Sequence, residues 1–188
     1  MSQCRNDNLV HFAVTVLSKD RPGIVADITE VLFRLGCNIE DSSCTMLGGD
    51  FAIILIVSHL RPFTKARLVD EFKTLHEQTG LTTHVRSLSE DEICPVKEEG
   101  ELCLVSVYGS DQPGIVYRVT RALADRRVNI TDLNTRLIGT KEEPVYVLML
   151  EAILPAGMTV DDAALLLENL KKELKVEIGV RAITPVAL

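Results

Sequence analysis

A short motif occurs twice in this chain, and the two copies lie 91 residues apart. The first, Lys19–Val25, reads KDRPGIV, and the second, Ser110–Val116, reads SDQPGIV. Each motif is followed at the same distance by an Asn-Ile-x-Asp sequence, which begins at Asn38 and at Asn129. One such motif arises easily by chance, whereas two motifs in the same register do not. The chain is therefore a tandem repeat, and both copies should fold into the same kind of unit.

The repeat predicts two domains within the 188 residues, each large enough for a modest hydrophobic core. We expect the first domain over residues 1–88 and the second over residues 101–188. Between them, residues 89–100 are rich in Asp and Glu and include Pro95 and Gly100. This composition is typical of an acidic, solvated linker.

Hydrophobic spacing predicts the first three elements of the first copy. His11–Leu17 is short and rich in residues that favour β-strands, which predicts a strand. A helix is expected from Pro22, which suits a first helical position, to a stop at Gly36, because apolar residues recur at helical spacing between them. Asn38–Met46 follows as a polar strand at a sheet edge.

The rest of the first copy completes a βαββαβ order. Phe51–Val57 is apolar at every position, which predicts a strand buried on both faces and something that covers the second face. A helix is expected over Thr64–Thr79 and a last strand over Leu81–Ser87. The second copy repeats the order over residues 102–108, 113–126, 129–137, 145–153, 159–174 and 176–184. The predicted fold is α+β, with two ferredoxin-like units whose antiparallel sheets carry both helices on one face.

The repeated motif brings together groups that suit a free α-amino acid. Pro22 opens a helix whose first amides, those of Gly23, Ile24 and Val25, have no acceptor within the helix and so attract a carboxylate. Asp20 precedes the helix and can accept a ligand's ammonium group. The second copy offers the same groups at Asp111 and at Gly114, Ile115 and Val116.

A plainer interpretation of these residues stays open. An Asp before a helix is usually a cap, and an Asn before a strand is usually a turn residue. A repeat can preserve a cap as readily as a binding group. Residue types alone therefore leave ligand binding and capping as alternatives.

The two motifs, each between a first strand and a helix and each followed by Asn-Ile before the second strand, resemble the ACT domain, a regulatory amino-acid-binding module. In ACT domains the ligand commonly lies where two domains abut, near the first strand-to-helix loop and the edge strand. The resemblance implies ligand-binding residues in both copies. They are Asp20, Gly23, Ile24 and Asn38, and Asp111, Gly114, Ile115 and Asn129.

The run Gly36–Ser42, with Met46–Gly48 and Phe51, is more specific. It resembles the glycine cleavage system transcriptional repressors, which consist of two ACT domains without a catalytic domain. The second copy lacks this run, and it has Gln112 in place of Arg21 and Arg127 in place of Gly36. The resemblance implies a sensor of a small, glycine-like amino acid that controls transcription through a protein partner such as a transcription factor.

Composition argues against several other classes of protein. The net charge is -7, from 20 Lys and Arg against 27 Asp and Glu, and aromatic residues are 4%, so direct nucleic-acid binding is not expected. No segment has the length and apolar character of a membrane span, and the five cysteines form no C-x-x-C pair, which favours reduced thiols in a cytoplasmic protein. No catalytic or metal-binding motif stands among the four histidines, so neither an enzyme nor a cofactor is expected.

Two functions follow from these observations. The first is the amino-acid-responsive regulator of transcription, in which a partner contacts the DNA. The second is an ACT scaffold that binds no ligand and acts only in protein interaction or oligomerisation. The apolar strands Phe51–Val57 and Val145–Leu150 require cover, which the tandem partner domain or a second chain could supply, and we expect a homodimer.

Overall fold

The computed structural model describes residues 8–93, 100–140 and 142–184, and the chain divides into two compact units between Val96 and Lys97. This division falls inside the segment expected as a linker. A short helix, α3 (Glu90–Ile93), occupies part of that segment, and residues 94–99 lie outside the described residues. The domain boundaries given above stay a prediction.

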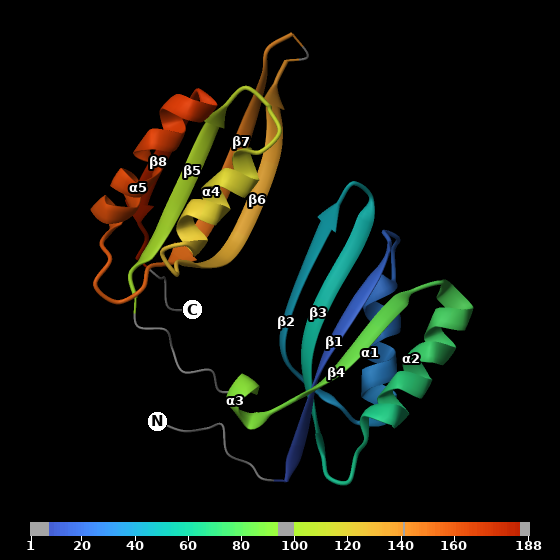
Figure 1. Ribbon diagram of the computed structural model, residues 1–188. Coiled ribbons are helices and arrows are strands. Elements are labelled where there is room, and N and C mark those ends of the chain that lie inside the picture. Colours follow the sequence, from blue (N-terminus) through green and yellow to red (C-terminus); the bar gives the residue numbers. More distant parts are fainter. Residues whose placement is uncertain (1–7, 94–99, 141, 185–188) are drawn as a thin grey trace. The chain divides into compact units, whose positions relative to one another are not determined.

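The first unit has the βαββαβ order (Figure 1). Its four strands form one sheet in the order β2-β3-β1-β4, in which every neighbouring pair is antiparallel. The polar strand β2 lies at the edge of this sheet, as the sequence predicts. The elements are β1 (Leu9–Lys19), α1 (Ile24–Leu35), β2 (Asn38–Leu47), β3 (Asp50–Leu60), α2 (Lys65–Thr79) and β4 (Thr82–Leu88).

The second unit repeats this architecture with the strand order β6-β7-β5-β8, again antiparallel throughout. Figure 1 shows both of its helices on one side of the sheet. The predicted α+β class and the tandem ferredoxin-like topology are therefore confirmed. The elements are β5 (Leu102–Gly109), α4 (Ile115–Ala124), β6 (Asn129–Gly139), β7 (Pro144–Ile153), α5 (Val160–Leu174) and β8 (Val176–Ala182).

Local sequence explains where the helices end and begin. Gly36 stops α1 by adopting the left-handed conformation, with φ 73°, and its amide donates to helix carbonyls. Thr64 caps α2 by accepting a hydrogen bond from the amide of Arg67. At the start of α5, Thr159 and Asp162 form a reciprocal capping box, in which bonds from the Thr159 amide and then its hydroxyl lower the pKa of Asp162.

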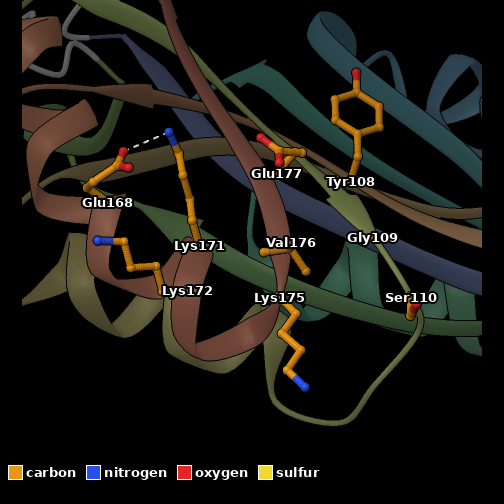
Figure 2. A pocket seen from close by; sticks show the side chains of 9 residues that line it. All are labelled: Tyr108, Gly109, Ser110, Glu168, Lys171, Lys172, Lys175, Val176 and Glu177. Carbon is orange, nitrogen blue, oxygen red and sulfur yellow. Dashed lines mark ion pairs between the residues drawn. The ribbon is translucent and has the colours of Figure 1, made fainter.

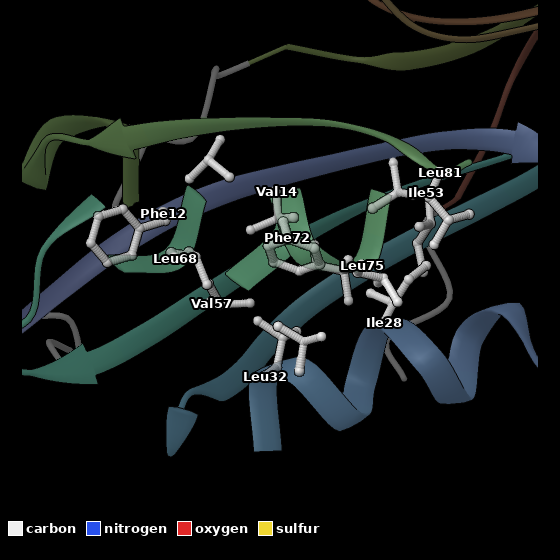
Figure 3. Close-up of a cluster of buried hydrophobic side chains, with 14 of the residues drawn as sticks. Phe12, Val14, Ile28, Leu32, Ile53, Val57, Leu68, Phe72, Leu75 and Leu81 are labelled. Carbon is white, nitrogen blue, oxygen red and sulfur yellow. The ribbon is translucent and has the colours of Figure 1, made fainter. Parts of the chain in front are cut away.

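Each unit has its own hydrophobic core between the helices and one face of the sheet. In the first unit, side chains of α1 and α2 pack on inward residues of β1 and β3, as Figure 3 shows for Ile28, Leu32 and Phe72. Among the described residues, none belongs to both cores. Each core is therefore built from side chains of its own unit.

The prediction that Phe51–Val57 is buried on both faces is wrong. In β3 the inward residues Ile53, Leu55 and Val57 are 5% exposed or less, whereas Ile54 on the other face is 51% exposed. The helices cover a single face, and an apolar run cannot show whether the opposite face has a cover. In β7, Val147 and Met149 on the outer face are likewise only partly buried.

Candidate functional site

Both motif glycines stand directly before a helix in the left-handed conformation. Gly23 has φ 88° and Gly114 has φ 99°, and the helices begin at the next residues, Ile24 and Ile115. The expected start at the proline is therefore wrong, because the chain makes one more turn at the glycine before it becomes helical. Side chains rarely adopt this φ, which explains why both copies have glycine here.

The helix starts leave several amide groups without an acceptor inside the helix. The first helical hydrogen bonds run from the amide of Asp27 to the carbonyl of Gly23 and from Arg118 to Gly114, each 2.9 Å long. The amides from Gly23 to Ala26 therefore point out of the end of α1 without a helical partner. Such a cluster carries partial positive charge and favours an anion such as a carboxylate.

Neither motif aspartate acts as a helix cap. No side chain caps α1 or α4 by a hydrogen bond. Asp20 and Asp111 are exposed, and within the described residues neither carboxylate has a hydrogen bond or ion pair. The amide of Asp20 donates to the Gly49 carbonyl at 3.0 Å, which ties the first motif loop to the β2–β3 hairpin. Both carboxylates are therefore free to accept a ligand's ammonium group.

The two motif loops are held in different ways. In the first copy the Arg21 guanidinium forms an ion pair of 2.5 Å with Asp27 in the first turn of α1. In the second copy the side-chain amide of Gln112 donates to the carbonyl of Leu174 at the end of α5. The difference between Arg21 and Gln112 in sequence thus changes what each loop is fastened to.

The predicted isoleucines contribute their backbone only. Ile24 is 3% exposed and Ile115 is 2% exposed, and both side chains belong to the hydrophobic cores. Their amides lie in the clusters at the helix starts. Any role in ligand binding therefore belongs to these amides, with the side chains fixing the helix ends on the sheet.

One unit does not bring the aspartate and the asparagine of the same copy together. In the sheet register Asn38 pairs with Ser58, which pairs with His11, whereas Asp20 follows the far end of β1. His11, which is level with Asn38, and Asp20 are nine residues apart along the strand. In an extended strand this corresponds to a distance of roughly 30 Å, which twist shortens somewhat. Asn129 lies level with Leu102 through Ile153, so it is equally distant from Asp111.

A hollow of about 660 Å³ lies beside Asn38 in the first unit. Its walls come from α1 and the start of β2, and they include Phe33, whose side chain is 82% exposed. Cys37 also lines it, and burial raises the pKa of this thiol more than Arg67 lowers it. A thiol with a raised pKa is a poor nucleophile at neutral pH.

A second hollow, of about 560 Å³, lies beside the motif of the second unit (Figure 2). Ser110, next to Asp111, forms one wall, and Lys171, Lys172 and Lys175 at the end of α5 form another. Lys171 pairs with Glu168 at 2.7 Å. No sequence pattern links these lysines to the motif, because their approach to it depends on how α5 packs on the sheet. The first copy has His76, Glu77 and Gly80 in their places.

Two other kinds of site are not found in the described part of the chain. No three His, Cys, Asp or Glu side chains there gather as metal ligands would. None of its helices is both long enough and apolar enough to cross a membrane. Cys44 is exposed and Cys103 is buried, and both are free thiols.

Comparison with known families matches the pattern of the ACT domain to residues 11–86 and again to residues 101–180. The chain belongs to the ACT domain family. Both matched segments coincide with the βαββαβ units, so the tandem ACT organisation expected from the repeat is confirmed.

Relatives of this ACT protein include a transcriptional repressor and a UPF0237 protein. It is 48% identical over 48 residues to the glycine cleavage system transcriptional repressor of Escherichia coli, a match that covers 26% of this chain and 25% of that protein. It is 34% identical over 74 residues to a UPF0237 protein of Streptococcus mutans, covering 39% of this chain and 84% of that protein. The matched region thus spans only about a quarter of the repressor's length.

A solved structure resembles the whole tandem ACT chain. A protein of unknown function from Galdieria sulphuraria superimposes with a TM-score of 0.79 at 26% identity, covering 94% of this chain and 99% of that one. This similarity agrees with the fold of both units. It carries no assignment of a ligand or a partner.

Proposed function

We propose that this ACT protein is a non-catalytic cytoplasmic regulator that senses a small, glycine-like amino acid and controls transcription through a protein partner. The observation that supports it most is the twofold occurrence of an exposed aspartate, unpaired among the described residues, beside a helix start whose first amides have no acceptor within the helix. The amides suit the carboxylate of an amino acid, and the aspartate suits its ammonium group. Similarity to a repressor of the glycine cleavage system supports the transcriptional role.

The size of the ligand limits its affinity. A glycine-sized ligand of five heavy atoms gains at most about 7 kcal/mol, which corresponds to a dissociation constant no tighter than roughly micromolar. That range suits a sensor of free metabolite pools. Binding acts on transcription only where it favours one arrangement of the protein over another, because a ligand shifts an equilibrium by its differential affinity.

The asparagines enter this proposal as residues of a neighbouring ACT domain. Since Asp20 and Asn38 lie at opposite ends of one sheet, a single small ligand cannot touch both within one unit. A second copy of the chain, placed antiparallel along the edge strand β2, would supply its Asn38 beside Asp20. The same arrangement applies to Asn129 and Asp111 along β6.

The same separation supports the alternative function. If no second copy completes the site, the aspartate end offers few contacts to a small ligand, and the protein would act as an ACT scaffold in protein interaction. Ligand-free scaffolding requires neither aspartate. The two functions therefore differ in what loss of Asp20 and Asp111 does.

A thermal-shift screen against the free amino acids, glycine and serine included, tests the proposal. A true ligand raises the melting temperature further as its concentration rises, because it binds the folded state alone. We expect Asp20→Ala and Asp111→Ala each to weaken this response and the double variant to abolish it. Calorimetry on the same variants measures the affinity directly.

Asp70→Ala provides the matched control, because Asp70 is an exposed carboxylate on α2 outside both motifs. It should leave the response intact. An undiminished shift in the double aspartate variant would refute the site, and no shift with any amino acid would favour the scaffold.

A further inference from the structure

The outer face of the second sheet, on the side away from α4 and α5, carries charges at its four corners and a further carboxylate, Glu151, beside Asp132. Across the strands, Asp132 lies level with Glu151, Leu104 and Arg181. Arg136 follows Asp132 by four residues on β6, and it lies level with Val147, Tyr108 and Glu177. Edge strand β6 thus has its acid at one end and its base at the other, and β8 has the reverse order.

The centre of this face is apolar and slightly hollow. Tyr108, Val147 and Met149 stand there, and with neighbours on β6 they line a hollow of about 170 Å³. Tyr108 is 42% exposed, and its hydroxyl lies 3.7 Å from the sulfur of Met149. An exposed aromatic group surrounded by charges is typical of an interaction surface.

The four corner charges remain available for a partner. None of Arg136, Glu177 and Arg181 has an ion pair with another described residue, and Asp132 only accepts a hydrogen bond from Asn134, at 2.7 Å. An acidic partner would be repelled at two corners and a basic partner at the other two. The partner must itself carry charges in an alternating pattern.

A second copy of the same face meets this requirement. If the copy is turned over about an axis parallel to the strands, Asp132 faces the other copy's Arg181, and Arg136 faces its Glu177. If it is turned over about an axis across the strands, Asp132 faces Arg136, and Arg181 faces Glu177. Both twofold arrangements set the opposite corner charges against each other and join the apolar centres, as an isologous interface requires. Glu151, the fifth charged side chain on this face, would face Leu104 of the other copy in the first arrangement and Val147 in the second.

The first sheet has only half of this pattern. Its corresponding corners are Asp41 and Arg86 on one level but Thr45 and Thr82 on the other. Arg86 is moreover engaged by Glu92. The complete set of alternating charges is therefore particular to the second unit.

We propose that the chain forms a homodimer by packing the outer faces of two second-unit sheets against each other, around Tyr108 and Met149. This interface joins the faces of two sheets and not their strand edges, and two of its residues, Tyr108 and Glu177, also border the hollow beside the second motif. It goes beyond the proposed function, since it requires no amino acid. It also provides the missing cover for the apolar outer residues of β7.

Sedimentation equilibrium over a concentration series at low salt tests the proposal, with circular dichroism to show that each variant is folded. We expect the wild type to dimerise and Arg136→Glu to raise the dimer dissociation constant about three- to tenfold, as loss of charge pairs at an interface rim does. In the Arg136→Glu variant, a second substitution Glu177→Arg should restore dimerisation if the twofold axis runs along the strands, because it re-forms the charge pair with opposite signs. Asp132→Arg should restore it instead if the twofold axis runs across the strands.

The apolar centre gives a second, independent variant. Met149→Glu places a charge in the middle of the interface and should raise the dissociation constant by roughly a hundredfold or more. Ile54→Glu is the matched control, because Ile54 holds the corresponding position on the outer face of the first sheet. It should leave the dimer intact.

Four results would overturn the proposal. They are a monomeric wild type, a dimer that Met149→Glu leaves unchanged, a loss with Arg136→Glu that neither second substitution repairs, and an equal loss with Ile54→Glu, which would place the interface outside the second unit. Arg136 and Met149 do not line the hollow beside the second motif, so the thermal-shift screen on Arg136→Glu and Met149→Glu measures the amino-acid response separately.

Discussion

Phe72→Ala is expected to lower the free energy of unfolding of the first ACT unit by about 3–5 kcal/mol, the usual loss for a large aromatic side chain in a core. Phe72 lies on α2, is 0% exposed and is among the largest fully buried side chains of the chain. It packs among Val14, Leu68 and Leu75 between the helices and the sheet (Figure 3). Its removal leaves a cavity that the surrounding strands cannot close.

Urea unfolding followed by circular dichroism, with calorimetry for the separate transitions, measures this effect. Because the two cores share no residue, we expect the transition of the second unit to stay where it is. Phe33→Ala is the matched control, since Phe33 is 82% exposed on α1 and should change stability by about 0.5 kcal/mol or less. A single transition that moves as a whole would show that the units do not unfold independently.

Gly139→Ala is expected to destabilise the second unit by at least about 2 kcal/mol, through backbone strain together with a steric clash. Gly139 ends β6 with φ 93°, a conformation that side chains rarely adopt. A Cβ atom there would lie 2.4 Å from the carbonyl oxygen of Glu143. Because that atom belongs to the backbone of the hairpin, no side-chain rotation relieves the contact.

Gly48→Ala in the first unit measures the loss of stability that comes from backbone strain alone, without a steric clash. Gly48 occupies the corresponding hairpin, has φ 61° and has nothing within 4 Å of an added Cβ atom. The substitution should cost only about 1–2 kcal/mol, the strain of a left-handed alanine. Thermal unfolding of both variants compares the two effects. Equal losses would show that the contact with Glu143 has no part in them.

The fold was predictable because its signals are local and occur twice. Helical spacing, the Thr64 cap and the stop at Gly36 each specify an element by short-range chemistry, and the structure confirms them. The start of α1 was misplaced, because a proline and a left-handed glycine both precede helices and the sequence does not order them. The outer face of β3 was misjudged because an apolar run is compatible with either one or two covered faces.

The candidate site was predictable only in part. The aspartates, the glycines and the free amides follow from the motif itself. The distance between Asp20 and Asn38 does not, because α1 returns the chain along the full length of the sheet before β2 begins. The lysines beside Ser110 were also not predictable from the sequence, since they approach the motif through tertiary packing of α5.

The two motif loops also differ in how ionic strength acts on them. Arg21 and Asp27, 38% and 33% exposed, form a charge pair that dissolved salt screens. The bond from Gln112 to the Leu174 carbonyl joins neutral groups, so salt hardly affects it. A rise in salt therefore weakens the Arg21–Asp27 contact of the first loop, which keeps its backbone bond from Asp20 to Gly49, and hardly changes the contact of the second loop. One polypeptide thus holds two versions of the same loop, one responsive to the ionic composition of its surroundings and one largely indifferent to it.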